Sequence, residues 1–341
     1  MTLPTRRLGR SGPSITRVGF GSWAIGGAGW PNAWGAQDDD AAVAAMRHAV
    51  ERGIDWIDTA AIYGLGHSEE LVGRLLRELP AGDRPLIFTK CGLRWDPAQP
   101  MKPAWRDLTP RSIREECEAS LRRLGVETID LFQFHRPDTD TGTPVEESWG
   151  EMGRLIEEGK VRWGGVSNFG IDLLERCERV RHVDSFQPPL SLIRRDAGAE
   201  LIPWCERNGT GVIVYSPMQA GLLTDRFSLE RVRSLPADDW RTRSPEFTSP
   251  KVERNVAVRD ALRPIAARHH TSVASVAIAW TLQWPGVTAA IVGGRSPEQV
   301  DGWIDAPSVT LDERDLRDIE RALEESGAGN GPVRPTVRVV T

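Results

Sequence analysis

The chain is poor in two residue types whose side chains exchange protons at high pH. It keeps only two tyrosines and four lysines among 341 residues: Tyr63, Tyr215, Lys90, Lys102, Lys160 and Lys251. A preference for arginine explains most of the scarcity of lysine, because all the other basic residues are arginines. Each phenol and each ammonium group that the chain retains is nevertheless a candidate for a chemical role.

Other absences exclude whole classes of protein. No run of about 18 apolar residues occurs, and no apolar run follows the first residues, so we expect neither a membrane span nor a signal peptide. The 43 basic and 48 acidic residues are scattered and give a net charge of −5, which favours neither a nucleic-acid nor a membrane partner. The four cysteines lie far apart in no metal-like spacing, so we expect no metal site and unpaired thiols in a reducing cytoplasm. The composition fixes no oligomeric state.

Eight short β-rich runs alternate with helical patterns, which predicts a parallel sheet with crossover helices. We expect the strands at 18–22, 54–58, 86–90, 129–135, 161–167, 183–187, 211–216 and 288–293. We expect the helices at 38–52, 68–79, 110–124, 145–158, 171–181, 197–208, 254–268, 273–283 and 297–304. Eight β/α pairs are the count of a closed (β/α)8 TIM barrel, so the sequence predicts an α/β protein of that class.

Segments outside the eight pairs complete the predicted domain. Residues 6–8 and 15–16 flank a Gly/Ser/Pro turn, and we expect them to form an N-terminal hairpin that plugs the floor of the barrel. Residues 311–324 predict an extra C-terminal helix. We expect a single domain over residues 1–326 and a loose C-terminal tail over residues 327–341.

An open doubly wound sheet is the rival architecture. The run Gly19-Phe-Gly21-Ser-Trp-Ala24 fits the G-x-G-x-x-A pattern of dinucleotide-binding folds. That pattern functions only where a helix starts at once, so that its amides face the pyrophosphate. Here a Gly- and Pro-containing run over 26–31 follows and is incompatible with a helix, so the barrel is favoured.

Polar residues end or interrupt the second to eighth predicted strands. In chain order they are Asp58, Lys90, His135, Ser167 with Asn168, Gln187, Tyr215 with Ser216, and Gly293 with Gly294 and Arg295. The carboxyl ends of the strands carry the reactive groups of a β/α barrel. We therefore expect Asp58, Lys90 and His135 on one face, joined by Tyr63 from the loop after Asp58.

This set of side chains suits the reduction of a carbonyl group by hydride, in which a phenol protonates the developing alkoxide. An ordinary tyrosine titrates near pH 10. We expect the Lys90 ammonium to lower the pKa of Tyr63 by about three units, or roughly 4 kcal/mol. Asp58 would hold the ammonium, and His135 would contact the carbonyl oxygen. Taken singly, such residues are more often helix caps, structural hydrogen-bond partners or turns, so the convergence carries the prediction.

Longer blocks of the sequence resemble the aldo-keto reductase family over nearly the whole chain. The matching segments are 53–64 with 67–73, then 88–90, 130–138 (Asp130-Leu-Phe-Gln-Phe-His135-Arg-Pro-Asp138) and 159–169. The resemblance implies a bacterial NADPH-dependent reductase acting on a small carbonyl compound. It also implies that Asp58, Tyr63, Lys90 and His135 form the catalytic tetrad, with Tyr63 as the general acid.

The same resemblance implies the contacts of the NADPH cofactor. Hydrogen bonds to the nicotinamide carboxamide are implied for Ser167, Asn168 and Gln187, and stacking on its ring for Tyr215. The pyrophosphate would be lined by Ser216, Gly221, Leu222 and Arg226. The adenosine end would be held by Gly293, Arg295, Gln299 and Asp301. Further cofactor contacts are implied for Gly21, Ser22, Trp23, Asp58 and Pro217. The guanidinium of Arg295 suits a 2′-phosphate, which favours NADPH over NADH.

Three positions depart from the family pattern. Trp303 stands where the family often has asparagine, and Gln187 is followed by two prolines and a leucine rather than by tyrosine or asparagine. The segment 293–296 carries a single basic residue. These departures concern the adenine contact, the surroundings of Gln187 and the preference for NADPH.

Tryptophans concentrate in the loops that follow the first, third and seventh predicted strands. They are Trp23, Trp30, Trp34, Trp95, Trp105 and Trp240. Of these we expect Trp23, Trp30 and Trp95 to contact the substrate together with Tyr63 and His135. Flat apolar walls suit an aromatic or hydrophobic carbonyl compound, and sugar stacking is equally compatible. The alternative is that half of these tryptophans pack the loops together.

Three other functions compete with carbonyl reduction. One is a non-catalytic NADPH-binding regulatory subunit, and another is a keto-sugar or polyol dehydrogenase working in the oxidative direction. The third is a hydrolase with paired carboxylates at strand ends about 5–10 Å apart. Asp58 is the one acid that we place at a strand end, which disfavours the hydrolase.

Overall fold

Eight parallel strands form a closed barrel in the computed structural model, which describes residues 2–236 and 239–334. Each strand pairs with the barrel strands before and after it in sequence, and the last closes on the first. The barrel strands are β3 Val18–Gly21, β4 Trp56–Asp58, β5 Leu86–Cys91, β8 Ile129–Phe134, β9 Val161–Ser167, β10 Ser185–Gln187, β11 Gly211–Tyr215 and β12 Val287–Gly293. The predicted (β/α)8 TIM barrel is confirmed.

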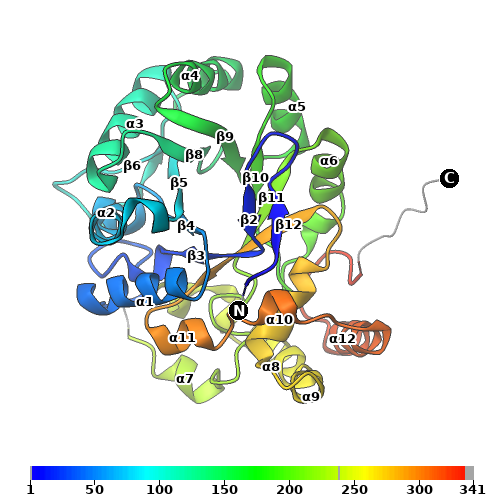
Figure 1. Cartoon of the computed structure of the whole chain (residues 1–341). Helices are drawn as coiled ribbons and strands as arrows, with labels where there is room; N and C mark the ends of the chain where they lie inside the picture. The colour runs from blue at the N-terminus through cyan, green and yellow to red at the C-terminus, as the bar shows by residue number, and fades with distance from the viewer. Residues whose placement is uncertain (1, 237–238, 335–341) are drawn as a thin grey trace.

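Helices surround the barrel as an outer ring (Figure 1). They are α1 Asp39–Glu51, α2 His67–Glu78, α3 Pro110–Leu124, α4 Val145–Glu157, α5 Ile171–Val180, α6 Leu201–Asn208, α7 Leu229–Arg233, α8 Lys251–Ala261, α9 Arg263–Arg268, α10 Val273–Leu282, α11 Pro297–Asp301 and α12 Glu313–Ser326. The single helix expected over 254–268 is two helices. Pro264 lies in the first turn of α9, and because proline has no N–H to donate, the helix breaks before it.

The N-terminal hairpin closes the floor of the barrel. Its strands β1 (Thr5–Arg7) and β2 (Ser14–Thr16) pair antiparallel and cross in front of the barrel in Figure 1. Leu8 and Ile15 are fully buried in one cluster with inward-facing barrel residues such as Phe88 and Leu131. The expected plug is therefore present.

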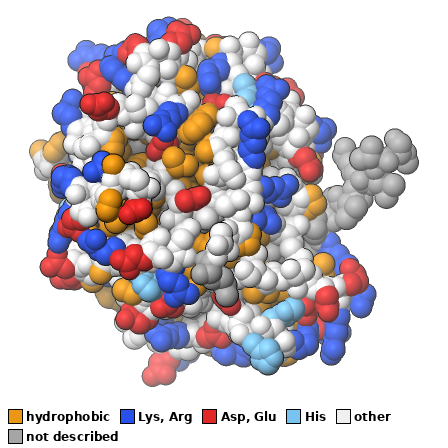
Figure 2. Space-filling model, viewed as in Figure 1, with side chains coloured by type: hydrophobic (Ala, Val, Ile, Leu, Met, Phe, Trp, Pro, Cys, Tyr) orange, Lys and Arg blue, Asp and Glu red, His pale blue; other side chains and the backbone are white. Residues whose placement is uncertain are grey.

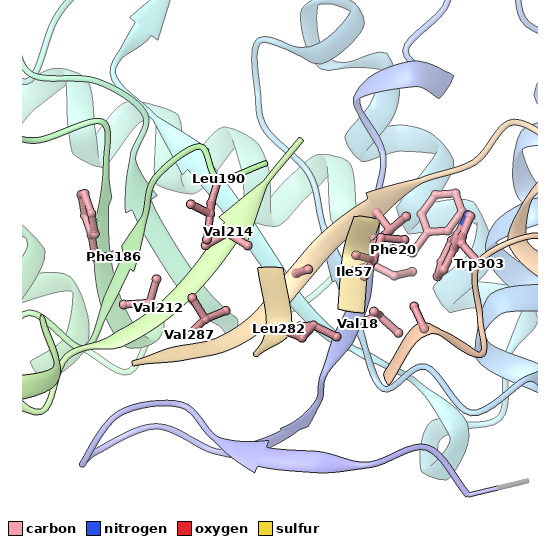
Figure 3. Close-up of a cluster of buried hydrophobic side chains, with 14 of the residues drawn as sticks. Val18, Phe20, Ile57, Phe186, Leu190, Val212, Val214, Leu282, Val287 and Trp303 are labelled. Carbon is pink, nitrogen blue, oxygen red and sulfur yellow. The ribbon is translucent and has the colours of Figure 1, made fainter. Parts of the chain in front are cut away.

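A second hydrophobic layer lies between the strands and the helices. Figure 3 shows part of it, where Val18 and Phe20 of β3 and Ile57 of β4 lie beside Trp303. Neighbouring residues on a strand face opposite sides, so Ile57 contributes to this outer layer while Trp56 belongs to the barrel interior. The same alternation places Asp58, Lys90 and Gln133 on the inner side of the barrel at the strand ends. They lie two residues beyond Trp56, Phe88 and Leu131, respectively.

The segment expected as a loose tail is attached over its first residues. The backbone N–H of Arg195 donates to the carbonyl of Asn330 at 2.9 Å, and its guanidinium donates to the carbonyls of Ala328 and Gly331. Arg334 pairs with Glu313 of α12 at 2.8 Å. Residues 335–341 lie outside the described residues, and the domain boundary at residue 326 stays a prediction.

Three features bear on the classes of protein that the composition excluded. Among residues 2–236 and 239–334, no helix is long and apolar enough to cross a membrane. On the face drawn in Figure 2, Lys and Arg side chains are interspersed with Asp and Glu side chains. All four cysteines are buried, and their thiols are free.

Candidate active site

Three neighbouring strands bring two charged side chains and an imidazole to the same end of the barrel. Asp58 ends β4 and pairs in register with Phe88 of β5. Lys90, the last but one residue of β5, pairs with Gln133 of β8. The backbone N–H of His135, just after β8, donates to the carbonyl of Cys91 at 2.9 Å. The strand register therefore positions the side chains of Asp58, Lys90 and His135 beside one another.

Lys90 and Asp58 form a buried ion pair. Nζ of Lys90 lies 2.5 Å from Oδ1 of Asp58 and 2.8 Å from the carbonyl oxygen of Thr59. The two charged residues are 1% and 2% exposed. Burial lowers the pKa of Lys90 and raises the pKa of Asp58, while the attraction between the two charges opposes both shifts. Each charge depends on the other because neither has access to water.

The turn after β4 presents Tyr63 to this ion pair. In the 3-10 turn Tyr63–Gly66, Gly64 has a φ of +60°, and a Cβ there would lie 2.1 Å from the carbonyl oxygen of Gly26. Glycine is therefore required at that position. Nζ of Lys90 lies 5.1 Å from the centre of the Tyr63 ring, and the His135 ring meets the Tyr63 ring edge-on with centres 5.7 Å apart. The four candidate side chains converge.

The pKa of Tyr63 is shifted in the direction opposite to our expectation. Burial, and then the negative charge of Asp58, raise the pKa of Tyr63 well above its ordinary value of 10, and Arg136 opposes this shift. The expectation was wrong because it counted the Lys90 ammonium and left out the loss of water around the phenolate, which is the larger effect. Tyr63 therefore keeps its proton at neutral pH.

His135 is held in its neutral form. Burial, followed by the positive charges of Lys90 and Arg136, lowers the pKa of His135 well below its ordinary value. A neutral imidazole carries one N–H donor and one acceptor nitrogen. Next to Tyr63, His135 is therefore a hydrogen-bond donor that adds no charge to the site.

Two glutamine side chains extend the network from the ion pair. Nε2 of Gln187 donates to Oδ2 of Asp58 at 2.9 Å and to Oε1 of Gln133 at 3.2 Å. Gln133 is fully buried, and its side chain lies close enough to Asp58 to lower the pKa of that carboxyl, although its Nε2 meets no hydrogen-bond geometry within the part of the chain that the structure describes. Gln133 was not among the residues predicted for the site. Its position two residues before His135 was the available signal, because alternation along an extended chain turns both side chains to the same side.

Hydrogen bonds join the ends of β8, β9, β10 and β11 beside His135. Nδ2 of Asn168 donates to the carbonyl of His135 at 3.0 Å and to Oγ of Ser167 at 2.9 Å. The Tyr215 hydroxyl donates to Oδ1 of Asn168 at 2.8 Å. Oγ of Ser167 donates to the carbonyl of Gln187 at 2.8 Å. The amide groups of Asn168 and Gln187 are therefore held in fixed orientations.

A cavity of about 960 Å³ lies against these groups. The expected cofactor residues that line it are Gly21, Trp23, Asp58, Ser167, Asn168, Gln187, Tyr215, Ser216, Pro217, Gly221, Arg226, Gly293, Arg295 and Gln299. The expected substrate residues that line it are Trp23, Trp30, Tyr63 and His135. Within residues 2–236 and 239–334, no group of three or more His, Cys, Asp or Glu side chains is arranged to hold a metal ion.

Four expected contact residues do not line the cavity. Ser22 is buried and accepts a hydrogen bond from Ser68 at 2.7 Å, and Leu222 is buried in the outer hydrophobic layer. Asp301 hydrogen-bonds His48 at 2.9 Å and pairs with Arg52, so side chains of α1 and of its C-cap hold its carboxylate. Trp95 packs against the cluster of Trp30 and Ile62. The predicted cofactor contact of Asp301 is not supported by its position.

Tryptophans of the loop after β3 cover Tyr63, and a tryptophan of the loop after β11 packs on one of them. Trp23, from the loop after β3, stacks on Trp240, from the loop after β11, with ring centres 5.1 Å apart. It also lies parallel to the Tyr63 ring at 6.4 Å. Trp34 meets both Trp23 and Trp240 edge-on. These rings, together with Trp30, form the apolar wall beside Tyr63, which we call the tryptophan wall.

Arg295, the residue expected to bind a 2′-phosphate, has protein partners. Its Nε donates to Oε1 of Gln37 at 2.5 Å, and its other nitrogens donate to the carbonyls of Trp34, at 3.2 Å, and of Ala36. Burial lowers its pKa. The guanidinium lines the cavity and at the same time holds the loop that carries Trp34.

Comparisons with known proteins agree with this geometry. The family model described as "Aldo/keto reductase family" matches residues 17–324. The aldo-keto reductase YhdN of Bacillus subtilis is 34% identical over 317 residues, covering 93% of this chain and 92% of that protein. The NADH-specific methylglyoxal reductase of Escherichia coli is 31% identical over 328 residues, covering 93% and 98%. The solved glycerol dehydrogenase of Gluconobacter oxydans is 37% identical, with a TM-score of 0.85 over 98% of this chain and 99% of that one.

Proposed function

The chain belongs to the aldo/keto reductase family, and from that premise we propose that it reduces an aldehyde or ketone with NADPH, with Tyr63 as the general acid. Members of the family are oxidoreductases that use nicotinamide cofactors. The observation that carries the proposal is the convergence of Tyr63, His135 and the Lys90–Asp58 ion pair on one cavity.

The residues around the cavity fit a nicotinamide dinucleotide. Asn168 and Gln187 present fixed amide groups beside His135 and Asp58, which suits a carboxamide partner. Arginines line the same cavity and suit a ligand with several phosphates: Arg226, Arg231, Arg241 and Arg295. When bound, the cofactor supplies a hydride from its nicotinamide ring to the substrate carbon.

Tyr63 supplies the proton of the reaction in this proposal. Its raised pKa keeps the phenol protonated before the reaction, so a proton is ready when the carbonyl oxygen gains charge. Lys90, with Nζ 5.1 Å from the centre of the Tyr63 ring, stabilises the phenolate that remains after the transfer. Asp58 keeps the ammonium charged and oriented. The neutral imidazole of His135 donates its N–H to the carbonyl oxygen and orients the substrate.

The preference for NADPH rests on Arg295. A phosphate dianion forms charge-assisted hydrogen bonds about twice as strong as those to neutral acceptors, so a 2′-phosphate would compete with the carbonyls of Trp34 and Ala36 for this guanidinium. The similarity to an NADH-specific reductase makes the comparison of the two cofactors decisive. We expect fluorescence titration to give a lower Kd for NADPH than for NADH. Arg295→Met should weaken NADPH binding more than NADH binding, and equal losses would contradict this assignment.

Oxidation of a polyol or sugar is the second candidate, and the similarity to a glycerol dehydrogenase favours it. It uses the same groups in reverse and requires the deprotonated form of Tyr63 to accept the proton of the alcohol, a form that the raised pKa of Tyr63 disfavours at neutral pH. A comparison of two sets of rates separates the two directions. One set is measured with NADPH and a panel of aldehydes, ketones and keto-sugars, and the other with NADP⁺ and polyols.

The same assay also tests the alternative of a non-catalytic NADPH-binding subunit. We expect NADPH-dependent turnover of at least one carbonyl compound. Tight NADPH binding without turnover of any compound in either direction would refute the proposed enzyme.

A further inference from the structure

Arg136 places a positive charge beside the candidate proton donor. It directly follows His135, is exposed, and lines the same cavity as Tyr63. In the part of the chain that the structure describes, its guanidinium forms no salt bridge. The nearby carboxylate of Asp138 is used within its own loop, where it accepts from the N–H groups of Leu108 and Thr141 at 2.7 and 3.0 Å.

The carboxylates that line the cavity are all engaged elsewhere. Asp58 pairs with Lys90, Asp38 caps α1 by accepting from the Ala41 N–H at 2.7 Å, and Asp225 accepts from the Val273 N–H at 3.0 Å. Glu298 lies in the first turn of α11 and is hydrogen-bonded to Ser296. No acid of the cavity lining therefore competes for Arg136 among the described residues.

The electric field of Arg136 reaches both groups that would contact the carbonyl oxygen. Its positive charge lowers the pKa of Tyr63, against the larger effect of burial, which raises it. It also lowers the pKa of His135, in the same direction as the larger effect of burial. Of the arginines in the cavity lining, Arg241 is paired with Asp239 at 2.7 Å, and Arg295 is bonded to Gln37, Trp34 and Ala36. Arg136 is the arginine whose charge acts on the Tyr63–His135 pair.

We propose that the substrate is a small aldehyde or ketone that carries a carboxylate, and that Arg136 binds this carboxylate while Tyr63 and His135 contact the carbonyl oxygen. This inference rests on the proposed reduction of a carbonyl compound. A planar guanidinium matches a carboxylate through two parallel N–H···O bonds. The tryptophan wall provides apolar area for the hydrocarbon part of the same molecule.

The exposure of Arg136 determines which kinetic constants should show the preference for a carboxylate-bearing substrate. A cation at the mouth of a cavity captures an anion from water, so it acts mainly on KM and on the rate of association. An exposed charge is screened by salt. The preference for a carboxylate-bearing substrate should therefore fall as ionic strength rises.

The test compares 4-carboxybenzaldehyde with methyl 4-formylbenzoate, which share a ring and a carbonyl group but differ in charge. The ratio of kcat/KM for the acid over the ester is measured with NADPH in the wild type and in Arg136→Gln. Dividing one ratio by the other cancels the intrinsic reactivity of the two aldehydes. Lys102→Gln is the matched control, because it removes one positive charge from the exposed loop after β5 without touching the cavity lining.

We expect Arg136→Gln to lower the acid-over-ester ratio by at least about tenfold, mainly through KM. Arg136→Lys should give an acid-over-ester ratio between those of the wild type and Arg136→Gln, because lysine keeps the positive charge but loses the planar guanidinium that forms two parallel hydrogen bonds. Lys102→Gln should leave the ratio unchanged. An unchanged ratio in Arg136→Gln, with the ester still reduced, would overturn this inference and leave carbonyl reduction standing. If the wild type reduces no aldehyde or ketone at all, the proposed function fails as well.

Discussion

Asp58→Asn tests whether the Lys90–Asp58 pair is held as two charges away from water. The substitution preserves shape and leaves the Lys90 ammonium, 1% exposed, with the Thr59 carbonyl as its remaining strong partner. Breaking one side of a buried ion pair costs about 3–5 kcal/mol. We therefore expect Asp58→Asn to lower the free energy of unfolding by that amount at pH 7, with a lower urea midpoint followed by tryptophan fluorescence.

The pH dependence of this loss gives the prediction a second test. Without Asp58, the folded-state pKa of Lys90 lies further below its ordinary value of 10.5, because burial is no longer opposed. The unfolded chain then binds more protons than the folded chain, so stability rises with pH until both forms are deprotonated. Each unit by which the pKa is lowered adds about 1.4 kcal/mol to this recovery. The deficit of Asp58→Asn should therefore be smaller at pH 9.5 than at pH 7.

The double variant Asp58→Asn with Lys90→Met is the control for this reasoning. It removes both charges, so its loss of stability should be smaller than the sum of the two single losses and independent of pH between 7 and about 9.5. A cost below about 1 kcal/mol for Asp58→Asn at pH 7, or additive losses in the double variant, would show that the pair is not a coupled buried pair.

Two further substitutions probe buried polar groups near the site. Burial raises the pKa of Glu116 to about 7 from an ordinary 4.5, so the folded state loses stability as the pH rises from about 4.5 to about 7. Glu116→Gln should therefore increase the free energy of unfolding by up to about 3 kcal/mol at pH 8 and by less than about 1 kcal/mol at pH 5. Equal gains at both pH values in urea unfolding would contradict this. Gln133→Leu removes the acceptor for Gln187 together with an amide nitrogen that has no hydrogen bond among the described residues. Fluorescence titration should therefore show NADPH binding weakened about 3- to 10-fold while Tm is unchanged or higher. A fall in Tm with normal binding would make Gln133 purely structural.

The sequence predicted the barrel because its signals are local and periodic. Strands such as Leu86–Cys91 alternate between the interior and the helix layer, and eight such runs in succession allow few other arrangements. The break at Pro264 was also visible in the sequence and was overlooked. The attachment of the segment after α12 was not visible, because it depends on the fit of Gly329 and Gly331 against the backbone of Ile193 and Arg195.

The site residues that lie at strand ends could be predicted from the sequence. The properties that depend on the packing of loops and distant side chains around the site could not. Asp58, Lys90 and His135 end neighbouring strands, so their convergence follows from the barrel. The direction of the Tyr63 pKa shift follows from burial, to which Trp23 and Trp30 of the loop after β3 contribute, and the sequence does not place that loop. The position of Asp301 depends on His48 and Arg52 of the first β/α unit, about 250 residues away in sequence.

The proton-donor role of Tyr63 is tested most directly by Tyr63→Phe, assayed with NADPH and the best carbonyl substrate of the wild type. We expect NADPH affinity within about twofold of the wild type and turnover lower by about 10²- to 10⁴-fold, which is the contribution of general acid catalysis. Tyr215→Phe removes the other phenol of the chain, which bonds Asn168, and should lose far less turnover. Near-normal turnover in Tyr63→Phe, with the cofactor bound as in the wild type, would contradict the account.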